Sequence, residues 1–279
     1  MTRTRLSVSY VADVLIRIAI YLIIFLFFGL PLLWLFTSAL SKTAGIAWQI
    51  PKQLTFANFT NVVHRHGMVR SFGNSLYISV ASGILAVIFA SVASYPLSRF
   101  KFRGRTFYLM IVLFATGLPI TALMVPLFEM FSKLGWLNSR FYVILVMAAL
   151  ATPMSIWLLK SFIDGVDASL EEAAWVDGAT RLRGYVQVVL PLARPGMVVA
   201  FILNFLVAWA NFYVPFILLS SSSKFPVAVS IYDFFGNYGG IQYGQLAAFS
   251  ILYALPVIVL YLLSGGRLGK SMNIGGVKG

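Results

Sequence analysis

The sequence predicts an all-α polytopic membrane protein, with six transmembrane helices and both termini cytoplasmic, as a single domain over residues 1–279. Hydrophobic residues make up 60% of the chain, charged residues make up only 10%, and the mean hydropathy is +0.89. A chain this apolar cannot cover its surface with polar groups, so it needs lipid as its solvent. Long apolar runs recur along the chain, and cationic residues concentrate between alternate runs.

Six apolar runs are the predicted membrane spans, because each is close to or longer than the roughly 20 residues that cross the hydrocarbon as a helix. They cover residues 18–40, 74–98, 106–128, 141–159, 196–219 and 246–264. The basic start of the chain, with Arg3 and Arg5, is typical of a signal peptide. The first run is too long for one and has no small-residue cleavage site after it, so we expect a retained span.

The cationic residues set the predicted orientation. Fourteen Lys and Arg residues lie on the side of the termini, of the loop at 99–105 and of the loop at 161–195 with its neighbour Lys160, against seven on the opposite side. Positive charge marks the cytoplasmic side of a membrane protein. Residues 41–71 and 220–245 are therefore predicted to be extracellular loops, and residues 161–195 a cytoplasmic loop.

Several function classes are excluded by what the sequence lacks. The chain has no cysteine, which excludes thiol catalysis, disulfides and cysteine metal sites. None of the six runs contains a charged residue or histidine, the groups that proton-coupled transporters and voltage sensors use. Sodium coupling through backbone carbonyls stays open. No catalytic or metal-binding constellation is present, so we do not expect an enzyme, a metal site or a cofactor in this chain.

The net charge of +13 does not indicate nucleic-acid binding. The basic residues are scattered between apolar runs and do not form a stripe. Positive loops of this kind are typical of contact with anionic lipid. We therefore expect membrane lipid, and no nucleic acid, as a partner.

The 161–195 loop departs from the basic trend, since five of the eight acidic residues of the chain lie between Asp164 and Asp177. Ser169 followed by Glu172 has the form of a capping box, which predicts a helix starting there. Gly178 is suited to end that helix in a left-handed conformation. Capping does not account for the other acids, so we expect a docking surface for a basic partner.

A second short helix is predicted to follow and to run back to the membrane. Its apolar face would hold Tyr185, Val188, Val189 and Leu192, with Pro191 interrupting it.

The fifth run contains polar and aromatic residues that suit a neutral, hydroxylated solute. Asn204 and Asn211 are seven residues apart, hence on one helical face, and Trp209 is close by. Amides bond hydroxyl groups, and aromatic rings cover the apolar face of a sugar. Hydrogen bonding between helices explains the amides equally well, and the pattern does not decide between the two.

The 169–191 stretch carries a family resemblance. Glu172-Ala173-Ala174, then Gly178, Val188 and Leu190-Pro191, resembles the EAA loop of binding-protein-dependent ABC importer permeases. The longer stretch EEAAWVDGATRLRGYVQVVLPLARPG is most similar to the carbohydrate-uptake branch, the maltose-type second permease. The segments 74–76, 95–104 and 273–279 resemble that branch too.

This resemblance implies the type I ABC importer permease (MetI-like) fold and a transport subunit that imports a sugar or oligosaccharide. The loop at 169–191 would be a coupling helix that transmits the movement of a separate ATPase to the solute pathway. The implied docking residues are Glu171, Glu172, Ala173, Ala174, Asp177, Gly178 and Ala179. The implied substrate path holds Asn204, Trp209 and Asn211.

The resemblance also implies partners and a location. They are a second homologous permease, two ATP-binding subunits that hold ATP and Mg, and an extracellular or periplasmic solute-binding protein. The assembly would lie in the prokaryotic cytoplasmic (inner) membrane. Two alternatives stay open: the same machinery carrying another solute, such as glycerol phosphate or an oligosaccharide acid, and a self-sufficient secondary transporter.

Overall fold

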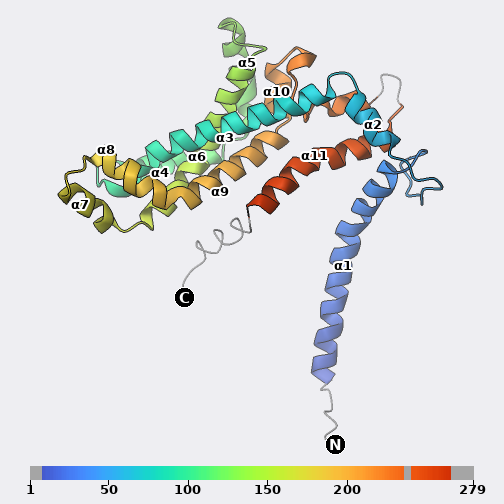
Figure 1. Ribbon diagram of the computed structural model, residues 1–279, viewed down its shortest axis with the longest axis horizontal. Helices are drawn as coiled ribbons and strands as arrows, with labels where there is room; N and C mark the ends of the chain where they lie inside the picture. The colour runs from blue at the N-terminus through green and yellow to red at the C-terminus, as the bar shows by residue number, and fades with distance from the viewer. Residues whose placement is uncertain (1–7, 236–239, 265–279) are drawn as a thin grey trace, which may run out of the picture. The chain divides into compact units, whose positions relative to one another are not determined.

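The computed structural model describes residues 8–235 and 240–264, and helices account for most of them (Figure 1). Within these residues the extended pairings are two isolated β-bridges, Ser41 with Leu54 and Phe235 with Ile241. The all-α prediction is confirmed. The chain divides into two compact units, one of residues 1–65 with 231–255 and one of residues 66–230 with 256–279.

The smaller unit contains α1 (Val8–Ala39), α2 (Ala57–His64) and the first part of α11 (Tyr243–Leu263). Within α1 the stretch Asp13–Ala39 has a mean hydropathy of 2.6, and the most apolar window in it is not buried inside the protein. Such a helix is stable only in an apolar surrounding, which lipid supplies.

A single amide closes the end of α1. Asn58 on α2 donates from its side chain to the carbonyls of Ala39 and Ser41, at 2.9 and 2.8 Å. The last carbonyls of a helix have no partner within the helix, so this side chain satisfies groups that would otherwise need water. The 41–71 loop is therefore held by α2, a helix that the sequence analysis did not predict.

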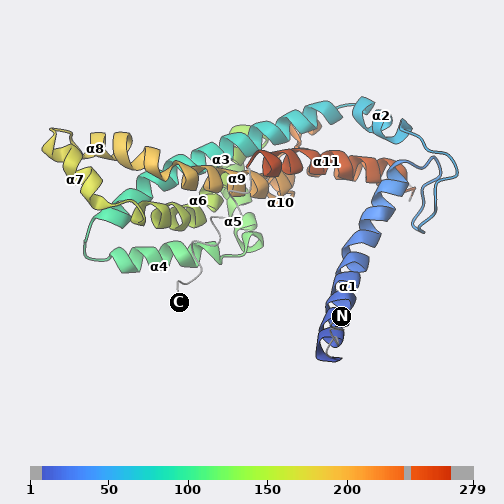
Figure 2. The ribbon, with the colours of Figure 1, turned by 60° about the horizontal axis from the view of Figure 1, so that its bottom comes forward.

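The larger unit is built on three long helices, α3 (Met68–Arg99), α6 (Arg140–Asp164) and α9 (Leu190–Ala210), which lie side by side (Figures 1 and 2). Their buried faces form the core of the unit. The buried residues near the 161–195 loop include Tyr95, Ile163, Tyr185, Val189 and Ala193. The middle of the core includes Val87, Leu159 and Ala200.

α6 and α9 pack closely at Gly196. A Cβ at this position would lie 2.4 Å from Cγ and 2.8 Å from Cβ of Phe162. Glycine is therefore required there, and its lack of a side chain lets the ring pack on the α9 backbone.

Residues 106–128, a predicted span, do not form a single straight helix. α4 (Arg105–Thr116) and α5 (Ile120–Lys133) are bent by 91° at a short break. Pro119 lies in the break with an extended backbone, and a proline also disfavours helical geometry at the residue before it. The described residues hold five helices long and apolar enough to span a membrane, or six if this bent pair is one span.

The run at 196–219 is also broken. α9 ends at Ala210, the backbone is extended at Asn211, and a short helix α10 (Tyr213–Leu218) follows. Two 3₁₀ turns, η2 (Ser222–Lys224) and η3 (Val229–Phe234), then occupy part of the predicted 220–245 loop.

Candidate functional site

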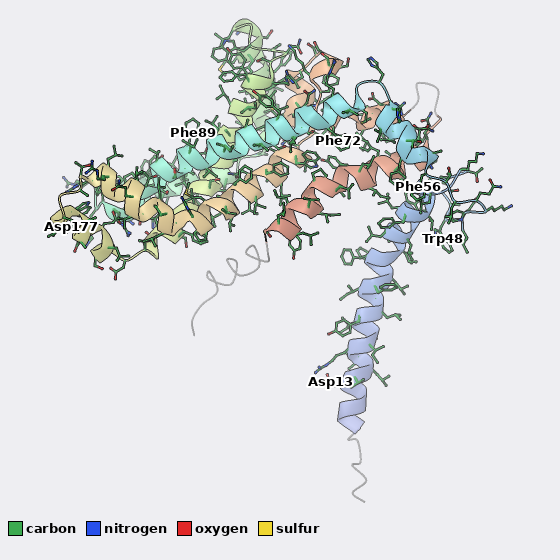
Figure 3. The ribbon with its side chains drawn as sticks, in the orientation of Figure 1. Asp13, Trp48, Phe56, Phe72, Phe89 and Asp177 are labelled. Atoms are coloured by element: carbon green, nitrogen blue, oxygen red, sulfur yellow. The ribbon has the colours of Figure 1, made fainter. Side chains whose placement is uncertain are left out.

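The 161–195 loop folds into a helical hairpin at one end of α3, α6 and α9. It contains α7 (Ala168–Val176), α8 (Arg181–Gly184) and a π-helical turn, η1 (Tyr185–Val189). Asp177 stands at the turn between α7 and α8, at the outer tip of the hairpin (Figure 3). The acidic residues that set this loop apart in the sequence are thus carried on a projecting structure.

The start of α7 differs from the capping box that the sequence predicts. The helix begins at Ala168, and its N-cap is Asp167, whose carboxylate accepts from the backbone N–H of Ser169 at 3.0 Å. That backbone donor, together with the side chain of Ser169, holds the pKa of Asp167 below its ordinary value. The prediction of Ser169 as the cap is wrong, because an aspartate two residues earlier satisfies the free N–H group first.

The end of α7 is the left-handed turn that the sequence predicts. Gly178 has φ of +88°. The N–H of Gly178 donates to the carbonyl of Trp175 at 3.0 Å, and that of Ala179 donates to the carbonyl of Ala174 at 2.9 Å. These bonds satisfy the last carbonyls of the helix, and a residue with a Cβ would be strained in this conformation.

The second helix of the hairpin is not a short one ended by proline. α8, the π turn and α9 run as one continuous helix from Arg181 to Ala210, 30 residues long. Pro191 lies in the first turn of α9, just after the π turn, and does not interrupt the helix. The prediction of an interruption is therefore wrong. The wider turn at Tyr185–Val189 bonds through i→i+5 pairs, so the helix continues past the proline.

Glu171 is buried and paired within the chain. Its side chain is 1% exposed; the hydroxyl of Tyr95 donates to Oε2 at 2.9 Å, and Nε of Arg99 forms an ion pair with Oε1. The same guanidinium donates to the carbonyl of Val166 at 2.8 Å. Removing a carboxylate from water is costly unless charged and hydrogen-bonding partners replace the water, as they do here.

Aromatic rings surround this ion pair. The ring of Tyr95 lies 4.5 Å from that of Tyr185 and 5.8 Å from that of Phe100. The guanidinium of Arg181 is 5.6 Å from the rings of both Phe100 and Trp175. These contacts join the end of α3 to α7, α8 and the π turn, so the hairpin is packed rather than loosely tethered.

The outer face of the hairpin mixes charge with exposed apolar groups. Among the predicted docking residues, Glu172, Ala173, Asp177 and Gly178 are exposed, Ala174 and Ala179 are half-buried, and Glu171 is buried. Val176 and Leu182 are 88% and 71% exposed. An exposed surface of this kind fits a protein partner. Glu171 faces the chain's own interior and does not belong to that surface.

The residues predicted to line a substrate path are separated by the break after α9. Asn204 is buried and exchanges hydrogen bonds with Ser155 of α6, at 2.9 and 3.1 Å. Trp209 is 2% exposed, and its ring stacks 5.7 Å from that of Phe205. Asn211 lies beyond the helix, so it does not share the face of Asn204.

Asn211 has a structural role in the break itself. Its side-chain oxygen accepts from the backbone N–H of Val214 at 2.9 Å, which starts α10. The amide of Asn204 therefore serves in a bond between helices, and that of Asn211 serves in the turn before α10. Their contact with solute stays a prediction.

Tyr95 and Arg99 are the functional residues that the sequence analysis missed. The sequence marks Arg99 as cytoplasmic and places both residues in the 95–104 segment that carries the family resemblance, but it assigns neither of them a partner. One signal was available: Tyr95 and Arg99 are four residues apart and therefore share a helical face at the end of a span.

The family model described as binding-protein-dependent transport system inner membrane component matches residues 82–271. This chain belongs to that family. The match contains α9 and the complete 161–195 loop. The chain is thus a multi-pass permease, a membrane subunit of a transport system that works with a solute-binding protein.

Individual relatives are similar in sequence over most of the length of this permease. It is 33% identical over 270 residues to the inner membrane ABC transporter permease protein YcjP of Escherichia coli (strain K12), covering 94% of both chains. It is 30% identical over 230 residues to the arabinooligosaccharides transport system permease protein AraQ of Halalkalibacterium halodurans, covering 82% of this chain and 81% of AraQ. It is 31% identical over 256 residues to the diacetylchitobiose uptake system permease protein NgcG of Streptomyces coelicolor, covering 88% and 82%.

A solved structure shows the same fold. A crystal structure of a bacterial ABC transporter involved in the import of the acidic polysaccharide alginate matches with a TM-score of 0.80 and 23% identity, covering 93% of this permease and 97% of that chain. The predicted importer permease fold is confirmed.

Proposed function

We propose that this chain is one of two permease subunits of an ATP-driven importer of a sugar or oligosaccharide, and that the 161–195 loop receives movement from an ATPase subunit. The observation that carries this proposal is the projecting hairpin, with Glu172 and Asp177 exposed, in a member of a binding-protein-dependent transport family. The hairpin is packed on the ends of three long helices, so a force applied to it acts on the core.

The proposed cargo follows from the relatives. AraQ and NgcG carry the names of saccharide uptake systems, and each covers more than four fifths of this chain. The proposed partners are a second homologous permease, two ATP-binding subunits and a solute-binding protein. ATP and Mg bind to the ATP-binding subunits, and this chain contributes no catalytic residue. The assembly lies in a prokaryotic cytoplasmic membrane with the hairpin on the cytoplasmic side.

The cargo and the energy source are tested together. The tagged chain is purified from its native membranes with its bound subunits and reconstituted in proteoliposomes. Uptake of labelled arabinooligosaccharide, diacetylchitobiose and glycerol phosphate is then measured with and without ATP. We expect saccharide uptake that requires ATP and the binding protein. Uptake of glycerol phosphate but of neither saccharide would show that the proposed cargo is wrong. Uptake by the purified chain without ATP would show that the protein is a secondary transporter and not a subunit of an ATP-driven importer.

The docking role of the hairpin is tested by two variants. Glu172→Lys reverses an exposed charge at the proposed contact, and Gly178→Pro removes the left-handed turn. Both variants are expected to insert normally and to lose uptake and transport-coupled ATP hydrolysis. Glu129→Lys, the same charge reversal at an exposed position of α5, is the matched control. Normal uptake by both hairpin variants would exclude the docking role.

A further inference from the structure

We propose that Glu171 is a positioning residue that fastens the hairpin to α3, so that the movement received by α7 reaches α3 directly through Tyr95 and Arg99. This inference rests on the proposed function and adds a route of transmission within the chain. It separates two adjacent acids: Glu172 faces outward, toward the proposed partner, and Glu171 faces inward.

The geometry fixes the carboxylate of Glu171 at two points. One oxygen accepts from the hydroxyl of Tyr95 and the other pairs with Nε of Arg99. These two partners are one helical turn apart on α3, so α7 is held in orientation as well as in distance. A single contact would allow α7 to pivot, whereas two contacts on one face oppose a pivot.

Arg99 also holds the segment that precedes α7. Its other arm donates to the carbonyl of Val166, between α6 and α7, at 2.8 Å. The guanidinium of Arg99, a residue of α3, therefore contacts both the segment between α6 and α7, at Val166, and α7 itself, at Glu171. A planar guanidinium with several fixed donors is suited to such a junction, and a lysine ammonium would not reproduce it.

Burial distinguishes this pair from the other ion pairs in the described residues. The side chains of Arg99 and Glu171 are 13% and 1% exposed, whereas Asp164 in the pair with Lys160 is 42% exposed and both partners of the Arg17–Asp13 pair are more than half exposed. Surface pairs contribute little, because water screens them, but removing one partner of a buried pair leaves an uncompensated charge. The cost of separating α7 from α3 is therefore concentrated at Glu171.

The connection to α3 matters because α3 contacts both of the other long helices of the core. α3 packs against both α6 and α9 and is the central helix of the larger unit. The hairpin already continues covalently into α6 at one end and α9 at the other. The bonds of Glu171 connect it to the third member of the core, the one with no covalent continuity to the loop.

A cysteine pair tests the proposal in the complete importer. The chain has no native cysteine, so Arg99→Cys with Glu171→Cys creates two unique thiols that a short bifunctional thiol reagent can bridge. Before bridging, we expect the ATPase subunit to stay bound and the solute moved per ATP to fall at least about tenfold, the factor that corresponds to ~1.4 kcal/mol. Bridging is expected to restore coupling, because it reconnects α7 to α3.

Leu170→Cys with Arg99→Cys is the matched control, because Leu170 is exposed, is not one of the proposed docking residues and makes no contact with Arg99 among the described interactions. Bridging this pair is not expected to restore coupling. Full coupling of the unbridged Arg99→Cys/Glu171→Cys protein, or bridging that leaves its coupling low, would overturn the proposal. If that protein does not assemble, the reversed pair Glu171→Arg with Arg99→Glu decides. Better coupling than Arg99→Glu alone supports the proposal, and equal loss overturns it.

The outcome is separable from that of the proposed function. If the wild-type importer shows no ATP-dependent uptake, the proposed function fails. If the wild type is coupled and the cysteine pair behaves like it, the function stands and the role of Glu171 fails.

Discussion

Replacing Gly196 with alanine measures how tightly α9 packs on α6. The added Cβ would lie 2.4, 2.6 and 2.8 Å from Cγ, Cδ2 and Cβ of Phe162. Two of these atoms belong to the stem of the ring, so rotating the ring about its own axis does not relieve the overlap. Either the side chain of Phe162 changes rotamer or the two helices move apart.

The expected magnitude follows from two opposing terms. Overpacking costs about 1–3 kcal/mol, and three overlaps, two of them at the ring stem, favour the upper end. Alanine is favoured over glycine in a helix by about 1 kcal/mol. The net loss for Gly196→Ala is therefore about 2 kcal/mol. Gly73→Ala in α3 is the matched control, because a Cβ there meets nothing within 4 Å and only the helix preference acts.

Thermal unfolding of the detergent-solubilised protein checks this. A loss of ~2 kcal/mol corresponds to a fall in midpoint of about 4–8 °C, and Gly73→Ala is expected to raise the midpoint by about 1–4 °C. Equal midpoints for the two variants would refute the reasoning, since they would show that Phe162 yields without cost.

Two further predictions concern the helix contacts and the cap. Asn204→Ala should destabilise the protein by about 0.6–1.7 kcal/mol, and a double-mutant cycle with Ser155→Ala should give a coupling of that size; additive losses would show that the amide acts elsewhere. The lowered pKa of Asp167 means that its cap persists above the unfolded-state value of about 4 and is lost only as pH falls through the lower folded value. The protection factor of the Ser169 backbone N–H in hydrogen exchange should therefore fall only in acid, and at neutral pH only when Asp167→Ala is added; protection independent of both would contradict the cap.

The spans could be predicted from composition, because long apolar runs are stable only in lipid, but the places where they break could not. Pro119 and Asn211 each lie within an apolar run, and a single such residue does not mark the end of a span in a hydropathy average. At Pro119 the missing N–H and the restricted backbone turn the chain by 91° between α4 and α5. At Asn211 the side-chain oxygen accepts a hydrogen bond from the backbone N–H of Val214, and hydropathy carries no information on that bond.

In the hairpin, the sequence predicts local elements but not how α7 is oriented. The first helix and the turn at Gly178 follow from local residue preferences, which is why they were predicted, whereas the length of the second helix was not. The orientation of α7 does not, because Glu171 and Glu172 are adjacent and about 100° apart around the helix. Which of them is buried depends on Tyr95 and Arg99, more than seventy residues earlier in the chain.

The continuous helix from Arg181 to Ala210 packs closely on α6 near its midpoint, at Gly196. The contact divides the helix into two segments of nearly equal length, so it is suited to act as the fulcrum of a tilting motion of the helix. At 1.5 Å per residue, each arm is about 21–22 Å long. A tilt of about 5° around the fulcrum moves Arg181 by about 2 Å and Ala210 by nearly the same amount in the opposite direction. If the helix tilts as a rigid rod, a small displacement at the hairpin is accompanied by an opposite one of similar size at the break before α10.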